Sequence, residues 1–380
     1  MRTYTISRLA PSIGVAAALL AGCGGATVPA NMSAQPAARS NALQGCSARI
    51  SGFARCGVAI ERRPPSNLPS GLSPQDLQSA YDLTRSAKSK GTGQIVAVID
   101  AYDNPNVASD LAGYRSEFGL PAANFTKYNQ EGQTGNYPQG SPAWGVEIDL
   151  DVEMVSASCP NCSIYLIEAN SNLVSDIDAA TAEAVTLGAH IVSLSAAGLS
   201  QSDQSYFDTR GVEYVASAGD SVPSYPADFD SVVAVGATVL SEDQGTKRGW
   251  SEEIWPDGGV GGCVTGVRKP RWQRDSYCKQ YRLANDVAAN AFGVAEYDTY
   301  DEGGWVRVDG TSVSTPLLAG IFGLAGNATE QDGGRTFWQP GHDKYLYAIT
   351  KGGGSGCVFL YKRKYNTCTG WGTPHGIGAF

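Results

Sequence analysis

The chain has 380 residues, a formal net charge of −9 and only 17% charged residues. This acidic balance argues against nucleic acid as a partner. The length allows a large hydrophobic core, in one big domain or two ordinary ones. Its 46 glycines indicate a loop-rich globular protein and exclude a highly charged, disordered one.

The first residues have the pattern of an export signal. Arg2 and Arg8 precede an apolar run, residues 13–20, that is too short to span a bilayer. The run ends in Leu-Ala-Gly-Cys at Cys23, which resembles the bacterial lipoprotein signal, in which the cysteine is lipidated. We expect a signal peptide over 1–22 and a lipid anchor on Cys23, and the alternative is a secretory signal cut slightly later. Either signal exports the protein, as a cell-envelope lipoprotein or as a secreted protein.

The cysteines agree with export. Of the nine cysteines, the eight that follow Cys23 fall into close sequence pairs, which indicates four disulfides in an exported protein. A redox role for the Cys-Pro-Asn-Cys motif at 159–162 is the alternative, but this motif precedes a strand instead of opening a helix. We expect no zinc site, because only three histidines are available. Proximity favours the pairs Cys46/Cys56, Cys159/Cys162, Cys263/Cys278 and Cys357/Cys368.

Residues 23–75 predict a polar tether and a short cysteine-pinned segment, and residues 76–380 predict one large domain. Within that domain, continuous apolar runs alternate with helical patterns, which is typical of βαβ units. The sequence therefore predicts an α/β fold with a doubly wound, mostly parallel sheet covered by helices on both faces. Residues 240–300 look loop-rich. The expected strands are 94–100, 163–167, 190–194, 213–216 and 232–235, and the expected helices are 76–86, 107–118, 145–157, 173–187 and 206–210.

Polar residues follow three of the predicted strands. Asp100, the Ser-Ala-Ala-Gly loop at 195–198 and the Ser-Ala-Gly-Asp loop ending at Asp220 each lie at the carboxyl end of a strand. In doubly wound sheets, reactive groups gather at this edge. We therefore expect these three loops to lie close together.

The predicted helix at 145–157 carries an unusual set of carboxylates. Glu147 and Asp151 are four residues apart and share one face, while Asp149 and Glu153 lie roughly opposite. A partly buried pair of this kind shares a proton, and the pKa of one member rises. Such a pair can act as a general base, although a solvated acidic helix face is the alternative.

A Gly-Thr-Ser turn at 310–312 runs into an apolar helical pattern. Because proline is tolerated in the first turn of a helix, Pro316 indicates that the helix begins near Ser312. A serine at this position is a candidate nucleophile if a base can reach it. The alternative is an ordinary N-terminal helix cap.

Three motifs assemble into a known pattern. They are Glu-x-x-Leu-Asp at 147–151, Ser-x-Gly-Asp at 217–220 and Gly-Thr-Ser-x-Ser-x-Pro at 310–316. In this order they resemble the sedolisins, the serine-carboxyl peptidases. Residues 96–130, 225–238, 258–263, 269–273 and the C-terminal Gly-Trp-Gly-Thr-Pro-His-Gly-Ile-Gly-Ala-Phe also resemble that family. The resemblance covers about residues 75–380 and implies a subtilisin-like fold.

The resemblance implies a role for each candidate site residue. Ser312 would be the nucleophile, Glu147 its general base, Asp151 the residue that orients and protonates Glu147, and Asp220 the oxyanion donor. A carboxyl donates a hydrogen bond only while protonated, so we expect an acidic pH optimum. The implied partner is a polypeptide substrate, and we expect a monomer.

Three departures from the family pattern leave an alternative open. The strand-end Ser-Leu-Ser-Ala-Ala-Gly at 193–198 replaces the usual Ser-Trp-Gly of the substrate cleft. The aspartates that begin the family's calcium site are missing after Tyr347 and in the turn 369–374, so we expect no calcium and no other cofactor. Sedolisins usually carry a long prodomain, but only about 50 residues separate Cys23 from the expected peptidase core. The alternative function is a catalytically impaired sedolisin-fold lipoprotein that binds peptides or partners.

A subtilisin, the other family with a Gly-Thr-Ser motif, is disfavoured. Subtilisins need a histidine base, and none of the three histidines, His190, His342 and His375, has that sequence context. Asp100 follows a strand in the manner of the subtilisin aspartate. Without a histidine partner, we expect Asp100 to cap its loop.

Overall fold

The computed structural model describes residues 41–42, 50–61, 66–220, 223–256, 258, 261–353 and 356–380. The described residues belong to one compact unit. The predicted signal peptide, the anchor at Cys23 and the disulfide partner Cys46 lie outside the described residues. The predicted domain limits stay predictions.

The core of this unit is an eight-stranded sheet in the order β11-β10-β9-β7-β4-β6-β5, with β14 also paired to β10. Every pairing is parallel except that of β11 with β10, which is antiparallel. The predicted α/β fold with a mostly parallel sheet is therefore confirmed. The strands are β4 (Ile95–Ala101), β5 (Asn124–Asn129), β6 (Ser163–Ala169), β7 (Ile191–Leu194), β9 (Glu213–Ser217), β10 (Val232–Glu242), β11 (Trp250–Ile254) and β14 (Val287–Asn290).

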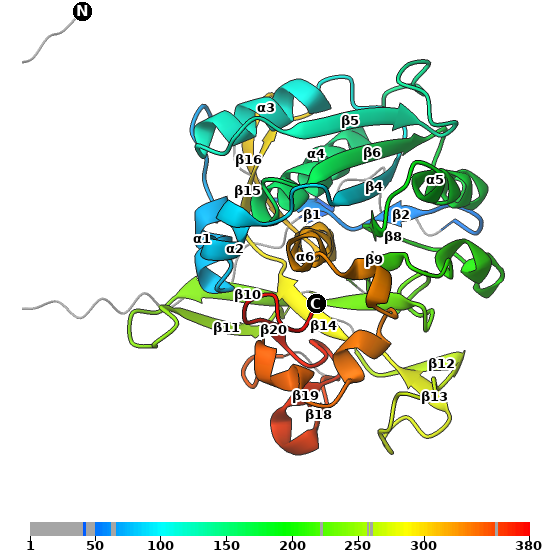
Figure 1. The fold of residues 1–380 in the computed structure, drawn as a ribbon, viewed down its shortest axis with the longest axis vertical. Helices are drawn as coiled ribbons and strands as arrows, with labels where there is room; N and C mark the ends of the chain where they lie inside the picture. The colour runs from blue at the N-terminus through cyan, green and yellow to red at the C-terminus, as the bar shows by residue number, and fades with distance from the viewer. Residues whose placement is uncertain are drawn as a thin grey trace, which may run out of the picture. The chain divides into compact units, whose positions relative to one another are not determined.

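Two long helices position the candidate site. α4 (Pro142–Ser158) and α6 (Thr311–Ala325) pack against each other and against the sheet, while α5 (Val174–Thr186) packs on β4 and β6. Nearly every residue of α4 and α6 is buried, including four acidic residues of α4. In Figure 1, α6 lies between the α4 region and β10, with the remaining helices around them. Those are α1 (Pro74–Ala80), α2 (Thr84–Ser89) and α3 (Val107–Glu117).

A second sheet packs beside these helices. It contains four strands in the order β1-β3-β16-β15, and β15 also packs against α3 and α4. Its strands are β1 (Asn41–Ala42), β3 (Ala59–Ile60), β15 (Val294–Asp298) and β16 (Gly304–Asp309). Two-stranded pairs are formed by β2 (Arg55–Cys56) with β8 (Ala196–Ala197), β12 (Cys263–Arg268) with β13 (Tyr281–Leu283), β17 (Leu346–Tyr347) with β20 (Thr373–Pro374), and β18 (Phe359–Leu360) with β19 (Tyr365–Asn366).

Several sequence-based predictions were wrong in detail. The single helix expected at 76–86 is two helices, because the chain turns at Asp82, which has a positive φ of 55°. The helix expected at 206–210 is a 3-10 helix, η1 (Gln201–Phe207), which begins with a Ser200 capping box. The loop-rich region 240–300 contains five strands, because its polar side chains hide the alternation that marks a strand.

Three of the four predicted disulfides are present. They join Cys159 to Cys162, Cys263 to Cys278 and Cys357 to Cys368. Cys56 is also disulfide-bonded, but its predicted partner lies outside the described residues. The bond at 159–162 follows α4 directly and pins the loop that leads into β6. These bonds agree with the disulfide reading of the cysteine pattern.

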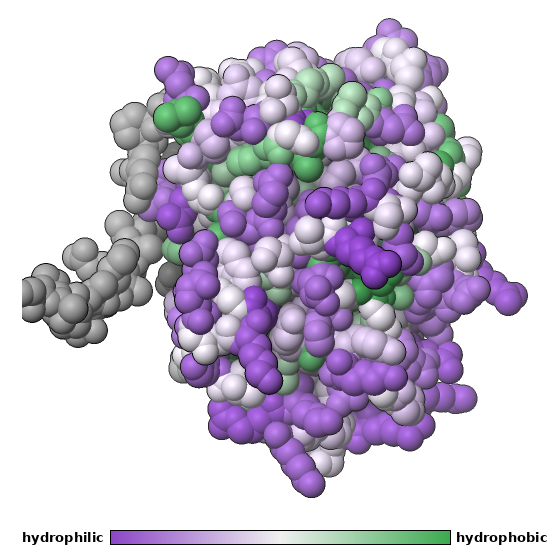
Figure 2. Space-filling view, turned by 60° about the vertical axis from the view of Figure 1, so that its left-hand side comes forward, coloured by the Kyte–Doolittle hydropathy of each residue, from purple (hydrophilic) through white to green (hydrophobic). Residues whose placement is uncertain are grey.

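One face of the molecule is mainly polar. The face shown in Figure 2 is mainly hydrophilic, with small and scattered hydrophobic areas. Among the described residues, no helix combines the length and the apolar character needed to cross a membrane.

Candidate active site

Ser312 lies in the first turn of α6, as the sequence predicts. The turn before it requires glycine, because Gly310 has a φ of 141° and the carbonyl of Gly57 occupies the space where a Cβ would stand. Pro316 falls in the second turn of α6 and cannot donate to the Ser312 carbonyl. The Ser195 hydroxyl instead donates to that carbonyl at 3.5 Å.

Glu147 and Asp151 are fully buried on α4. Burial raises the pKa of Glu147 well above its usual value, the Asp151 carboxyl raises it further, and the Ser312 hydroxyl beside it opposes the rise. Ser312 Oγ and Glu147 Oε1 nevertheless lack a partner of good hydrogen-bond geometry among the described residues. The hydroxyl and the carboxyl are therefore neighbours that need a small movement to form a full hydrogen bond.

Asp220 follows β9 and lies beside the start of α6. Its Oδ1 accepts hydrogen bonds from the Thr311 N–H at 3.0 Å and the Thr311 hydroxyl at 2.8 Å. Burial raises the pKa of Asp220, and the two hydrogen bonds from Thr311 oppose the rise. Because Oδ1 is occupied by donors, a proton on this carboxyl belongs on Oδ2, the oxygen that faces Gly57.

The segment 55–60 crosses this site in an extended conformation. On one side, β2 pairs antiparallel with β8, which lies in the loop expected to line the substrate cleft. On the other side, β3 pairs with the end of β16, directly before Gly310. The segment is thus held by backbone hydrogen bonds on both sides of Gly57 and Val58.

Gly57 and Val58 lie against the candidate catalytic groups. A Cβ on Gly57 would stand 2.8 Å from Asp220 Oδ2 and 3.3 Å from Ser312 Oγ. The N–H of Val58 donates to Glu147 Oε2 at 3.1 Å. The chain's own Gly57–Val58 peptide unit therefore touches three of the four predicted site residues. The sequence contained no signal for this contact.

Asp100 lies beside Glu147 and Asp151, so the prediction that it caps its loop was wrong. It is fully buried, and neither carboxyl oxygen has a hydrogen-bond partner among the described residues. Burial raises the pKa of Asp100, and Glu147 is the largest charged contributor to the rise. Burial likewise raises the pKa of Asp151, with Asp100 adding to it and the Ser195 hydroxyl opposing it. The expectation that reactive groups gather at the carboxyl ends of the strands indicated this position.

The three histidines are used elsewhere. His190 contacts the Gly211 carbonyl through Nδ1, His375 stacks on Tyr347, and His342 hydrogen-bonds to the backbone of Ala379. No recorded contact joins any of them to Ser312. The only titratable groups recorded beside Ser312 within the described residues are therefore carboxyls.

The residues at the family's calcium position do not fit the ion. Ile349 packs with Ile254 and Cys368 in a small apolar cluster, and no aspartate or glutamate follows Asp343 in the sequence. Asp343 itself pairs with Lys364. Calcium requires about six oxygen ligands with carboxylates among them, so this region lacks the necessary donors. The absence of calcium there stays a prediction.

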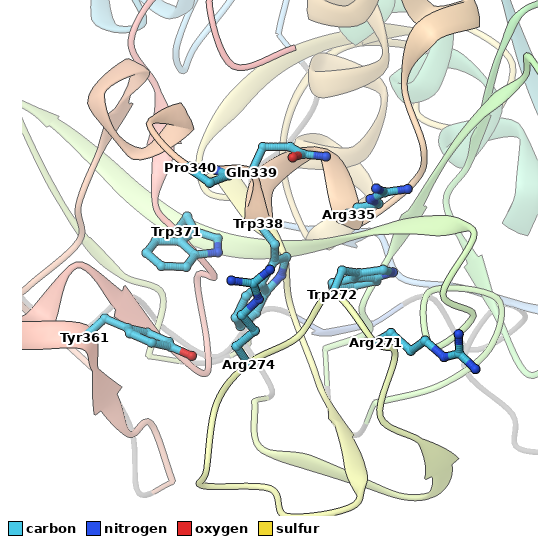
Figure 3. Close-up of a pocket in the computed structure, with 9 residues that line it drawn as sticks. All are labelled: Arg271, Trp272, Arg274, Arg335, Trp338, Gln339, Pro340, Tyr361 and Trp371. Atoms are coloured by element: carbon cyan, nitrogen blue, oxygen red, sulfur yellow. The ribbon is translucent and has the colours of Figure 1, made fainter.

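A separate cavity of about 510 Å³ contains none of the four predicted residues. Figure 3 shows the arginine and aromatic side chains that surround it. Trp371 and Trp338 pack edge to face at 5.3 Å, and Trp338 donates to Asp286. The lining residues are Arg271, Trp272, Arg274, Arg335, Trp338, Gln339, Pro340, Tyr361 and Trp371.

Residues 128–353 match the model of the subtilase family. The chain belongs to the subtilase family. Within it, the chain is similar to kumamolisin from Bacillus sp. (strain MN-32), at 27% identity over 371 residues, covering 84% of this chain and 64% of the relative. It is also similar to sedolisin from Pseudomonas sp. (strain 101), at 23% identity over 356 residues, covering 81% of this chain and 60% of that relative. These matches confirm the sedolisin resemblance.

The fold of this subtilase agrees with a solved relative. A structure of Pseudomonas sedolisin, a serine-carboxyl proteinase complexed with two molecules of pseudo-iodotyrostatin, superposes with a TM-score of 0.69 at 21% identity. The match covers 81% of this chain and 96% of that one. The subtilisin-like fold expected from the motifs is therefore confirmed. The chain spans less than two thirds of the length of the two curated relatives.

Proposed function

We propose that this subtilase is a serine-carboxyl endopeptidase that hydrolyses peptide bonds through an acyl-enzyme. One observation carries the proposal: an extended peptide, residues 55–58, already lies across Ser312, Glu147 and Asp220. The pairing of β2 with β8 supports the view that the altered loop 193–198 can hold a peptide backbone. Backbone pairing of this kind recognises a polypeptide with little dependence on its sequence.

Each residue has a defined task in this reaction. Glu147 accepts the Ser312 proton while Oγ attacks the carbonyl carbon of the peptide bond. The protonated Oδ2 of Asp220 donates a hydrogen bond to the oxygen that becomes negatively charged. Glu147 then gives its proton to the departing nitrogen. Water attacks the resulting ester on Ser312, with Glu147 again as base, and releases the acid product.

Two further carboxyls adjust the general base. Asp151 lies one turn along α4 from Glu147, and its carboxyl raises the pKa of Glu147. Asp100 is close to both residues. Three carboxyls in one buried site cannot all be ionised, so at least one carries a proton. We assign Asp151 the role of orienting Glu147 and supplying that proton. The coupling between these carboxyls suits catalysis at acidic pH.

The same peptide segment can keep the enzyme inactive. Residues 55–58 exclude substrate while they occupy the cleft, and the Val58 hydrogen bond occupies Glu147. Turnover of an added polypeptide therefore requires the segment to leave or to be cut. We propose that the structure represents this closed form.

The second candidate function is a catalytically impaired subtilase that binds peptides or partners. The altered loop at Ala196 and Ala197 and the occupied cleft favour it. The two functions differ in turnover. An unfolded protein substrate is incubated with the full chain between about pH 3 and 7, with Ser312→Ala as the matched control. Cleavage by the wild type alone supports the peptidase, and a folded wild type that binds substrate without cutting it supports the binder.

Export and anchoring are part of the proposal. The sequence around Cys23 supports a lipoprotein attached to the cell envelope, with a secreted protein as the alternative. Replacement of Cys23 by serine should release the protein from the membrane fraction. Retention of the Cys23→Ser chain in that fraction would contradict lipid anchoring.

A further inference from the structure

A group of buried carboxyls lies on the other face of α4 from Glu147 and takes no part in the proposed reaction. One carboxylate oxygen from each of Asp110, Asp149 and Asp298 lies within 4.8 Å of the others. Glu153 and Glu296 lie beside them and add to the negative charge that surrounds Asp149. We call these five residues the acidic cluster.

The acidic cluster joins three elements that pack together. Asp110 comes from α3, Asp149 and Glu153 from α4, and Glu296 and Asp298 from β15. Figure 1 shows α3 and β15 beside the α4 region. All five side chains are buried, and each is at most 1% exposed.

Several carboxyls of the cluster are held by one oxygen and leave the other without a partner. Asn104 donates to Asp149 Oδ2 at 2.6 Å, and the Tyr297 N–H donates to Glu153 Oε2 at 3.2 Å. The Asp301 N–H donates to Asp298 Oδ1 at 2.8 Å. The opposite oxygens, Oδ1 of Asp149, Oε1 of Glu153 and Oδ2 of Asp298, have no hydrogen-bond partner among the described residues, and neither oxygen of Glu296 has one.

The cluster also lacks a cationic side chain. None of the ion pairs recorded for the described residues includes any of its five members. Buried charges in proteins are paired with opposite charges or coordinate metals, because an isolated buried charge is very costly. Asp110 differs from the members held by one oxygen, because the Thr299 N–H and hydroxyl donate to both of its oxygens, but carboxylates that bind metals are themselves hydrogen-bonded.

We propose that Asp110, Asp149 and Asp298 bind one calcium ion through their carboxylate oxygens, with the negative charge of Glu153 and Glu296 beside them favouring the cation. Oxygens within 4.8 Å of one another suit a central ion at the 2.3–2.6 Å typical of calcium. Calcium accepts flexible sets of carboxylates, whereas magnesium keeps several waters, for which a fully buried site has little room. The site is distinct from the family's C-terminal calcium position and independent of the proposed peptidase activity.

The test uses the full chain carrying Ser312→Ala, so that self-digestion cannot interfere. After treatment with a chelator, the protein is titrated with calcium chloride near pH 7, and bound calcium and the thermal midpoint are measured. We expect one calcium per chain and a rise of about 5 °C at a hundredfold excess over Kd. Magnesium chloride is the salt control, and an equal shift with both salts would contradict the site.

Two added substitutions separate calcium binding from simple charge repulsion. With calcium present, Asp298→Asn should lose the bound ion and the thermal shift, whereas Asp178→Asn, a buried carboxyl on α5, should keep both. If protons alone neutralise the cluster, Asp298→Asn relieves repulsion and raises the midpoint, and calcium has no effect on the parent chain. That result, or a parent chain with no bound calcium, overturns the proposal even if a variant fails to fold.

Discussion

The backbone N–H of Val58 donates a 3.1 Å hydrogen bond to Oε2 of Glu147. This nitrogen belongs to the peptide bond that follows Gly57, which itself lies against Ser312 and Asp220. The carboxyl proposed as general base therefore already contacts a peptide nitrogen of the kind it would protonate in a substrate. The same contact opposes the rise that burial causes in the pKa of Glu147.

Replacement of the general base should have a large and specific effect. In Glu147→Gln the side chain keeps its size but cannot accept the Ser312 proton, so we expect kcat to fall roughly a hundredfold to ten-thousandfold. Glu242→Gln, an exposed carboxyl at the end of β10, is the control and should leave kcat unchanged. Steady-state cleavage of an unfolded protein measures both, and a Glu147→Gln enzyme with normal kcat would exclude this residue as the base.

The pH profile should be bell-shaped with its maximum in acid. Glu147 must be ionised to act as base, so protonation of Glu147 forms the acid limb, and because burial and the Asp151 carboxyl raise the pKa of Glu147, this limb lies at a higher pH than for an ordinary glutamate. Burial raises the pKa of Asp220 above that of an ordinary aspartate, and ionisation of Asp220 removes the oxyanion donor and forms the alkaline limb. We expect little activity at neutral pH and above. A profile that peaks at neutral or alkaline pH is incompatible with these roles.

Asp220→Asn offers a sharper test of the alkaline limb. An asparagine can accept from Thr311 through its oxygen and donate through its nitrogen at every pH. We expect Asp220→Asn to keep more activity than Asp220→Ala, which should lose roughly a hundredfold to a thousandfold. The asparagine variant should also lose the alkaline limb. If both variants fall equally and keep the wild-type profile, Asp220 is not the donor.

The occupied cleft makes a prediction about Gly57. A side chain at this position would collide with Asp220, since even a Cβ would lie 2.8 Å from Oδ2. Gly57→Val should displace the segment and raise the initial rate on an added peptide roughly tenfold, because overpacking costs about 1–3 kcal/mol. Gly135→Val is the control, since a Cβ there has open space. Equal initial rates for wild type and Gly57→Val would show that the segment does not restrain the enzyme.

The fold and the site differ in how far local sequence signals could reveal them. The strand at β4 and the helices α3 and α5 were predictable, because their apolar patterns have the right period and length. β5 was missed, since its sequence Asn-Phe-Thr-Lys-Tyr-Asn is largely polar and only partly buried. The four proposed site residues were chosen through motifs whose spacing reflects one helix face and two strand ends.

Contacts between distant segments left no such signal. Nothing in the local pattern of residues 55–60 shows that they pair with Ala196 and Ala197 on one side and with β16 on the other. The acidic cluster was equally hidden, because Asp110 and Asp298 are separated in sequence and only the packing of α3 and β15 on α4 unites them. The alternative interpretation of the acidic residues of α4, a solvated helix face, is wrong, because these residues are fully buried.

The most direct test of the proposed reaction is detection of the acyl-enzyme. The full chain is mixed with a peptide substrate at acid pH, quenched within the first turnover, and digested for mass spectrometry. We predict an adduct with the mass of the acyl half of the peptide on Ser312, which Ser312→Ala abolishes together with cleavage. A chain that cleaves the peptide while Ser312 stays unmodified, or a Ser312→Ala chain that cleaves at the wild-type rate, would contradict it.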